Sequence, residues 1–203
     1  MIFIPLQYPD PGFIEKDLQR FYDLALEDYR RSFCFLEFDL DLDPEAATQI
    51  QEEPSILRAN LVNPQGLKRG LEAACLALGG CDSKTLVLGS ALNLLLFSPT
   101  YGARTLAFLE ATFRDDKSKT YLFTVSSSAL SDKIEVLERA ADHLFFVEMK
   151  RPEKELHLWV ERIKGAAFTH ERVIVPFRRE DIEATKNLAD ASRVARIPAI
   201  RKI

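Results

Sequence analysis

The distribution of hydrophobic and polar residues predicts strands that alternate with helices through the first part of the chain. Residues 2–6 are an apolar run typical of a buried strand, and residues 12–30 place apolar side chains at helical spacing. Residues 32–43 predict a second strand, in which apolar and acidic side chains alternate toward the end. The acidic stretch 44–54 predicts a loop with a short helix.

The same alternation continues through the middle of the chain. Asn63 and Pro64 begin a predicted helix, which Gly79 and Gly80 end, and residues 84–90 form the clearest buried strand. The other elements predicted here are strands at 56–62 and 120–125 and helices at 103–114 and 132–141. Strands that alternate with helices imply right-handed βαβ units and a mainly parallel sheet.

The pattern changes near the carboxyl end, where strands follow one another with few helices between them. Residues 143–149, 155–163 and 171–177 predict hairpin-like strands, which we expect to extend the sheet in antiparallel fashion. A helix at 182–194 and an exposed basic tail follow. The predicted fold class is therefore α/β, with three layers, as one domain over residues 1–180 followed by a helix and tail over 181–203.

Composition and charge narrow the class of protein. The 203 residues are 47% hydrophobic and carry a net charge of −4, which does not favour nonspecific binding to nucleic acid or to an anionic membrane. No apolar run approaches the roughly 20 residues that span a bilayer, and no leader pattern opens the chain, so we expect a cytoplasmic protein. Cys34, Cys75 and Cys81 form no C-x-x-C motif, and we expect them to be reduced and not to bind zinc.

The order of elements, together with several short motifs, resembles the RecA-like ATPase core and its KaiC-like branch. That family places G-x-x-x-x-G-K-[ST] between a strand and a helix; here Gln7 and Gly12 stand in the glycine positions, Phe13 in the lysine position and Ile14 in the hydroxyl position. The segment 86–91 resembles the family's Walker B strand, with Gly89 where the aspartate belongs. The resemblance therefore implies degenerate Walker A and Walker B motifs.

These replacements remove the chemistry that holds Mg-ATP. A phosphate-binding loop uses backbone N–H groups, a lysine and a helix amino terminus, and its hydroxyl helps to hold Mg²⁺. Pro9 and Pro11 have no N–H to donate, and Asp10 would repel phosphate. We therefore expect a pseudo-ATPase with no catalytic residues, no cofactor and no metal. The alternative from the residues alone is a strand, turn and helix in an unrelated α/β fold.

A second set of residues resembles the surface through which the family meets its neighbours. Residues 160–165 resemble the family's Lys-x-Arg-Gly element, whose basic residue reaches the nucleotide of an adjacent subunit. The basic tail carries isoleucines beside its arginines, a pattern that favours docking on protein. The predicted interface residues are Arg162, Lys164, Gly165, Arg196, Ile197, Ile200 and Arg201.

Two further clusters have both a chemical and a structural interpretation. Glu37, Asp39, Asp41 and Asp43 would share one face of a strand, as a hard-metal site or, as we favour, a solvated strand end. Residues 126–128 are three serines after a buried strand, where a nucleophile or a helix cap would fit; we favour the cap. The histidines that could act as a base are His143, His157 and His170.

The resemblance implies a function in binding. We expect a non-catalytic regulatory or scaffolding subunit that assembles with itself or with a RecA-like paralogue, and that does not bind membranes. One alternative is a nucleic-acid-binding subunit, like a recombinase paralogue or the RecA-like subunits of Elongator. Another is a residual nucleotide-sensing ATPase.

Overall fold

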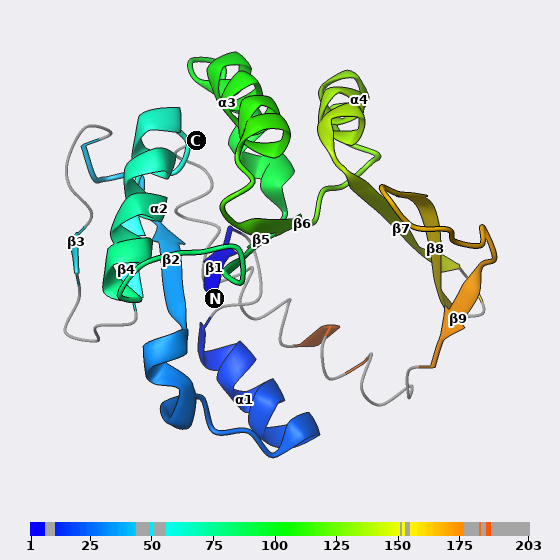
Figure 1. Ribbon diagram of the computed structural model, residues 1–203, viewed down its shortest axis with the longest axis horizontal. Helices are drawn as coiled ribbons and strands as arrows, with labels where there is room; N and C mark the ends of the chain where they lie inside the picture. Colours follow the sequence, from blue (N-terminus) through cyan, green and yellow to red (C-terminus); the bar gives the residue numbers. More distant parts are fainter. Residues whose placement is uncertain are drawn as a thin grey trace.

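The main sheet of the protein has six strands in the order β3-β4-β2-β1-β5-β6 (Figure 1). The computed structural model describes residues 1–6, 11–43, 49–50, 56–150, 152, 155–176, 183 and 186–187. The strands are β1 (Ile2–Pro5), β2 (Cys34–Phe38), β3 (Gln49–Ile50), β4 (Ile56–Ala59), β5 (Leu86–Ser90) and β6 (Thr120–Phe123). Every neighbouring pair is parallel except β3 and β4, which confirms the predicted, mainly parallel sheet.

The first strand lies at the centre of this sheet. β1 pairs with β2 on one side and with β5 on the other, and all four of its residues are buried. The chain builds outward from β1 through β2 to β4 and then crosses to the opposite side with β5 and β6. The strand order therefore reverses between β1 and β5, the position at which open α/β sheets usually bind ligands.

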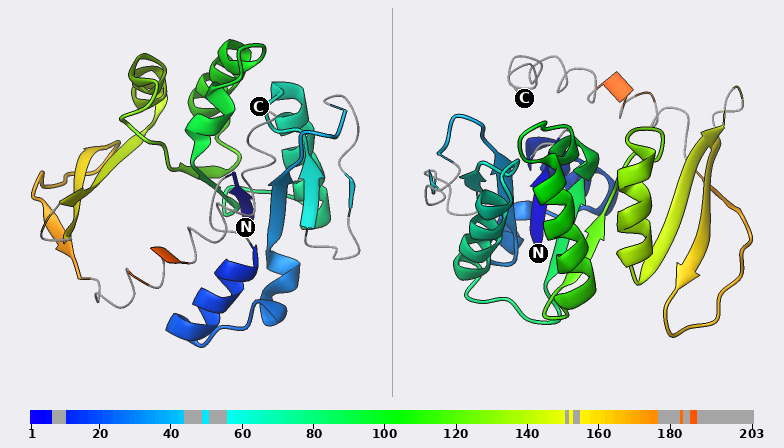
Figure 2. Two further views of the ribbon diagram at one scale, coloured as in Figure 1. Left: turned by 180° about the vertical axis from the view of Figure 1, so that it is seen from behind. Right: turned by 90° about the horizontal axis from the view of Figure 1, so that it is seen from above.

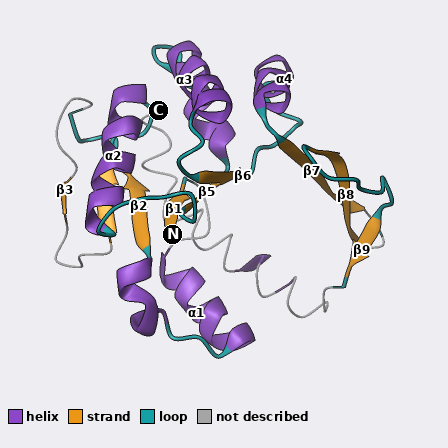
Figure 3. Cartoon of the chain, in the orientation of Figure 1, coloured by secondary structure: helices purple, strands orange, loops and turns teal. Residues whose placement is uncertain are grey.

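Helices cover both faces of the main sheet, which gives the predicted three layers. Figure 1 shows α2 and α3 on one face and α1 on the other, and Figure 3 shows the same layers coloured by type of element. The helices are α1 (Pro11–Tyr22), α2 (Pro64–Ala77), α3 (Gly102–Asp115) and α4 (Ser131–Ala140), with short 3-10 helices η1 (Leu26–Ser32) and η2 (Leu92–Leu96). Among the described residues, no helix is long and apolar enough to span a membrane.

Local signals account for the helix ends. The Asn63 side chain accepts a hydrogen bond from the backbone N–H of Gln65 and so caps α2, and Gly79 and Gly80 at φ 78 and 122 end it, as predicted. The prediction of one helix over 12–30 was wrong. The backbone turns at Asp23, where φ is 54, and the chain resumes as the separate helix η1.

The second strand is also shorter than predicted. β2 ends at Phe38, and the backbone N–H of Asp41 donates to the Asp39 carboxylate, a local hydrogen bond that forms a turn in place of a sheet ladder. The predicted loop at 44–54 lies mostly outside the described residues, apart from β3.

The carboxyl-terminal strands form a sheet of their own, which corrects the expectation that they would extend the main sheet. β7 (His143–Lys150), β8 (Glu155–Ile163) and β9 (Val173–Val175) make an antiparallel sheet, called the C-terminal sheet below (Figure 2). The predicted helix at 182–194 and the tail lie outside the described residues, except for Glu183, Lys186 and Asn187. The boundary at residue 180 therefore stays a prediction.

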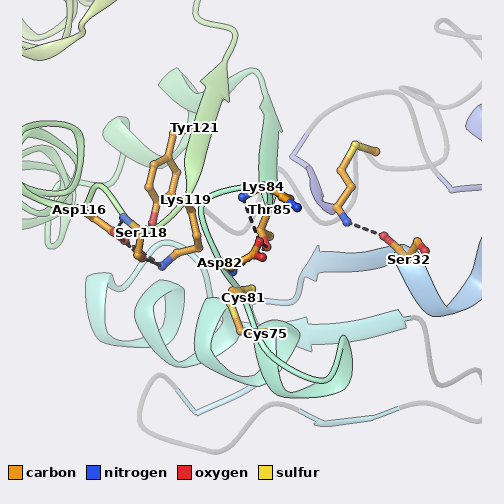
Figure 4. Close-up of a disulfide and its surroundings, with 11 residues drawn as sticks. Ser32, Cys75, Cys81, Asp82, Lys84, Thr85, Asp116, Ser118, Lys119 and Tyr121 are labelled. Carbon is orange, nitrogen blue, oxygen red and sulfur yellow. Dashed lines mark hydrogen bonds and ion pairs between the residues drawn. A yellow bond between two sulfur atoms is a disulfide. The ribbon is translucent and has the colours of Figure 1, made fainter.

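Two cysteines also differ from the prediction. Cys75 in the last turns of α2 forms a disulfide with Cys81, so these residues are not reduced thiols (Figure 4). The turn at Gly79 and Gly80 folds the chain back over the helix end and brings the two sulfur atoms together. Cys34 is a free, buried thiol in β2, and burial raises its pKa to about 11.

Candidate functional site

The start of α1 holds the residues predicted to replace a phosphate-binding loop. Gly12 and Phe13 lie in the first turn of α1, and the Phe13 side chain is 8% exposed. Ile14 follows on the helix and is half-buried. Phe13 and Ile14, which we predict to stand in the lysine and hydroxyl positions, are apolar side chains at the start of this helix. Gln7 lies outside the described residues, so the alignment of the whole loop stays a prediction.

The position of the predicted Walker B aspartate is occupied by Gly89 and covered by an aromatic ring. Gly89 pairs with Phe123 across β5 and β6. A Cβ atom built on Gly89 would lie 2.3 Å from Cδ1 and 2.5 Å from Cε1 of Phe123. The Phe123 ring stacks on Phe113 of α3, at 5.4 Å between centroids, and on Tyr121, at 5.9 Å. A carboxylate at position 89 would therefore have to displace a packed ring.

Beyond Gly89, the chain hydrogen-bonds to the end of β6. Ala91 has φ 53, and its N–H donates to Thr124 Oγ1 at 3.1 Å, while the N–H of Leu92 donates to the Thr124 carbonyl at 2.9 Å. The buried Asn93 accepts a hydrogen bond from the N–H of Ser126 at 3.2 Å. These bonds tie together the carboxyl ends of the two strands that carry Gly89 and Phe123.

The serines after β6 are not arranged as a catalytic group or as a helix cap. The hydroxyls of Ser126 and Ser128 lie 3.0 Å apart, and α4 begins after Leu130, at φ 59, without a side-chain cap. The predicted cap was therefore wrong. His157 is buried and lies 3.0 Å from the Glu155 carboxylate, and His170 lies against the Phe168 ring. Within the described ranges, no hydrogen bond joins a histidine to these serines.

The acidic residues predicted at the end of the second strand are divided between β2 and the turn that follows it. Glu37 lies on β2 and pairs with Arg58 of β4 at 3.3 Å, whereas Asp39 and Asp41 lie in the turn that follows. In the part of the chain that the structure describes, no group of three or more His, Cys, Asp or Glu residues could hold a metal ion. The carboxylates therefore do not share a strand face.

The predicted interface element lies where the C-terminal sheet meets α4. Arg162 on β8 is half-buried, and its guanidinium donates to the Glu138 carbonyl of α4, while its Nε is buried without a partner in the described structure. Lys164 pairs with Asp142 at 2.8 Å and leaves 67% of its side chain exposed. Gly165 is exposed, with φ 79. Arg196, Ile197, Ile200 and Arg201 lie outside the described residues.

Asp142 connects two parts of the fold and was not identified from the sequence. Its carboxylate accepts from Lys164 after β8 and from Lys117 before β6, at 2.8 and 3.0 Å. The hydrogen bonds from Lys164 and then Lys117 lower the pKa of Asp142 to about 2. A bridging acid between two lysines distant in sequence gives no local signal, so sequence reasoning could not find it.

A second ionic cluster closes the loop before β6 (Figure 4). Asp116 accepts hydrogen bonds from Ser118 and from the Tyr121 hydroxyl, each at 2.6 Å, and pairs with Lys119 at 2.9 Å. Burial opposes ionisation of Asp116, but these hydrogen bonds outweigh it and hold its pKa well below the usual range. Burial and the Asp116 carboxylate raise the pKa of Tyr121. The cluster fixes the aromatic residues around Phe123.

One face of the C-terminal sheet is apolar and exposed. Phe145, Val147 and Met149 alternate along β7 and are 47%, 60% and 43% exposed, and Val173 on β9 is 58% exposed. Their cross-strand partners on β8 are Val160, Leu158 and Leu156. On the other face, Trp159 stacks on Phe146 at 5.2 Å and lies under the Arg172 guanidinium at 4.3 Å. Such an apolar face is typical of an interaction surface.

Comparison with known proteins shows the fold. No protein-family model matches the chain, and no curated protein matches it. A KaiC-like protein from the hyperthermophilic archaeon Pyrococcus horikoshii superposes with a TM-score of 0.54 and 11% identity, covering 86% of this chain and 76% of its own. An uncharacterized protein from the same organism was solved in complex with an unknown peptide. It superposes with a TM-score of 0.52 and 11% identity, covering 88% of this chain and 80% of its own. The chain therefore has a RecA/KaiC-like α/β fold, as predicted.

Proposed function

We propose that this RecA/KaiC-like domain is a non-catalytic regulatory or scaffolding subunit that acts by binding another polypeptide. The observation that carries the proposal is the position of Phe123. Its ring fills the space in which a Walker B carboxylate would begin, since a Cβ on Gly89 would approach the ring to 2.3 Å. A Walker B aspartate acts through Mg²⁺, so its loss removes a ligand that nucleotide hydrolysis needs.

The aromatic packing around Phe123 holds the ring over position 89, where the acid would be. Phe123 stacks on Phe113 and Tyr121, and Tyr121 is held by Asp116. An acid restored at position 89 would have to displace the Phe123 ring from these contacts. Phe13 and Ile14 support the proposal because neither supplies a charge or a hydroxyl at the start of α1.

Binding of a polypeptide is supported by the exposed apolar face of the C-terminal sheet. Phe145, Val147, Met149 and Val173 present a larger apolar surface than isolated exposed residues would. One protein of similar fold was solved in complex with an unknown peptide, which supports the proposal. We propose a RecA-like paralogue or a second copy of this chain as the assembly partner.

Titration calorimetry with Mg-ATP tests nucleotide binding, and an assay of phosphate release tests hydrolysis. We expect no heat of binding and no phosphate release with millimolar ATP, and the same result when Mg²⁺ is removed with a chelator. Micromolar, Mg-dependent ATP binding would refute the proposal and favour a nucleotide sensor. Light scattering of the purified chain, alone and with RecA-like paralogues from its source, tests assembly; a monomer with every paralogue would remove the scaffolding role.

A further inference from the structure

The unit formed by β6, α4 and β7 is divided between two sheets. A strand, a helix and a second strand in this order usually place both strands in one parallel sheet. Here β6 is the last strand of the main sheet, and β7 is the first strand of the C-terminal sheet. Figures 1 and 2 both place the C-terminal sheet beyond β6, with β7 nearest to it.

The two strands are connected near their starts by an ion pair. Lys117, just before β6, reaches Asp142, just before β7, at 3.0 Å. Neighbouring strands of one sheet lie about 4.8 Å apart and are joined by backbone hydrogen bonds. Here the side chains of Lys117 and Asp142 join the two strands instead. Among the described residues, no strand pairing joins β6 to β7.

On the side away from β5, the backbone groups of β6 pair with no strand in the described part of the chain. The N–H groups of Thr120 and Thr124 donate to Thr85 and Gly89, on the β5 side. Backbone groups alternate sides along a strand, so the N–H and C=O of Tyr121 and Phe123 point away from β5. These groups form a template for an added strand.

The first residues of both strands lack the usual protection of a sheet edge. Charged side chains or prolines commonly prevent edge strands from pairing with other chains. Residues 120–124 of β6 contain neither, and β7 contains no proline and carries Glu148 and Lys150 only near its end. Leu122 is 47% exposed on β6, and Phe145 and Val147 are 47% and 60% exposed on β7. The edges therefore match an uncharged, apolar strand.

We propose that an extended, apolar and uncharged segment of a partner polypeptide inserts as a strand between β6 and β7. The segment would pair with the free groups of Tyr121 and Phe123 and place apolar side chains beside Leu122 and Val147. The inference rests on the proposed function and assigns the binding position on this domain.

The test uses short random peptides displayed on phage and selected on the purified full chain, after which the strongest binder is synthesised. We expect selected peptides to alternate apolar, β-branched residues, and hydrogen exchange with the synthetic peptide to protect amides in 120–124 and 143–149. Leu122→Lys and Val147→Lys should each weaken binding roughly tenfold, because a charge replaces apolar area that binding would bury. Leu76→Lys is the matched control, since Leu76 is 80% exposed on α2, and should bind as the unmodified chain does.

The outcomes separate this inference from the proposed function. Protection at another surface would refute the insertion site and leave polypeptide binding intact. No enriched peptide would refute the insertion and would weaken the proposed function as well. A dimer of the unmodified chain whose β6 amides are protected without peptide would replace the proposed occupant with a second copy. Circular dichroism of each variant confirms that it is folded.

Discussion

Replacing Gly89 by alanine is expected to destabilise the domain, although the backbone at this position suits alanine. Gly89 does not have a left-handed φ, so the substitution causes no backbone strain. Its added methyl group meets the Phe123 ring instead, at 2.3 and 2.5 Å from two ring carbons. The effect of the substitution therefore measures how firmly the aromatic packing holds Phe123 in place.

The expected magnitude follows from two opposing effects. Overpacking a well-filled interior typically costs about 1–3 kcal/mol of unfolding free energy. Replacing glycine by alanine at a compatible backbone position stabilises by about 0.4–1 kcal/mol, because the unfolded chain loses freedom. Phe123 is half-buried and stacked on Phe113, so the ring can move only at the cost of that contact. We expect a net loss of about 1–2 kcal/mol.

Urea denaturation followed by circular dichroism measures the change. The midpoint should fall while the slope with urea stays constant, since the unfolded surface is unchanged. The only tryptophan, Trp159, lies in the C-terminal sheet, so its fluorescence reports separately on that sheet. Coincident transitions by both probes would support two-state unfolding of the whole domain.

The double variant with Phe123→Ala is the internal control. In that background the added methyl group meets no ring, and Gly89→Ala should be neutral or stabilising by about 0.5 kcal/mol. A single variant as stable as the unmodified chain would refute the argument that Phe123 occupies the acid's position. If Gly89→Ala destabilised the unmodified chain and the Phe123→Ala variant equally, a contact other than Phe123 would cause the loss of stability.

Three further predictions concern other parts of the fold. Reduction of the Cys75–Cys81 disulfide should destabilise the domain by about 2 kcal/mol by the chain-entropy argument, and a variant with serine at both positions should not respond to dithiothreitol. The Asp142 carboxylate should stabilise the fold above its unfolded pKa of about 4, and this stabilisation should be lost as the pH falls toward about 2. In Asp142→Asn the urea midpoint should therefore depend less on pH over that range. Asn63→Ala should cost about 1 kcal/mol in the same assay, through loss of the α2 cap.

Elements with strong local signals were predicted well from the sequence. The cap at Asn63 and the glycines after Leu78 set the ends of α2, and the apolar runs of β1 and β5 set the centre of the sheet. Helix periodicity alone did not show that α1 ends at Tyr22, because the left-handed Asp23 follows no glycine or proline signal.

Contacts between distant segments were not predictable in the same way. The cover of Gly89 by Phe123 depends on the register of β5 and β6, which a single strand pattern does not specify. The disulfide depends on the fold of the turn after α2, and the Lys117 and Lys164 pairs of Asp142 depend on tertiary placement. The sequence pattern of β7 predicts a strand but does not indicate that this strand belongs to a sheet separate from β6.

The central position of β1 also sets the order in which the protein can fold. β1 precedes the other strands in the chain, yet all four of its residues pair with β5, whose residues 86–90 leave the ribosome much later. The strands of the C-terminal sheet, in contrast, pair with segments close in sequence. Contacts between distant residues form slowly, so we expect completion of the main sheet at β1 to limit the folding rate. Until then, the buried side of Ile2 and Ile4 is open to premature association, and the nascent chain is most vulnerable before β5 emerges.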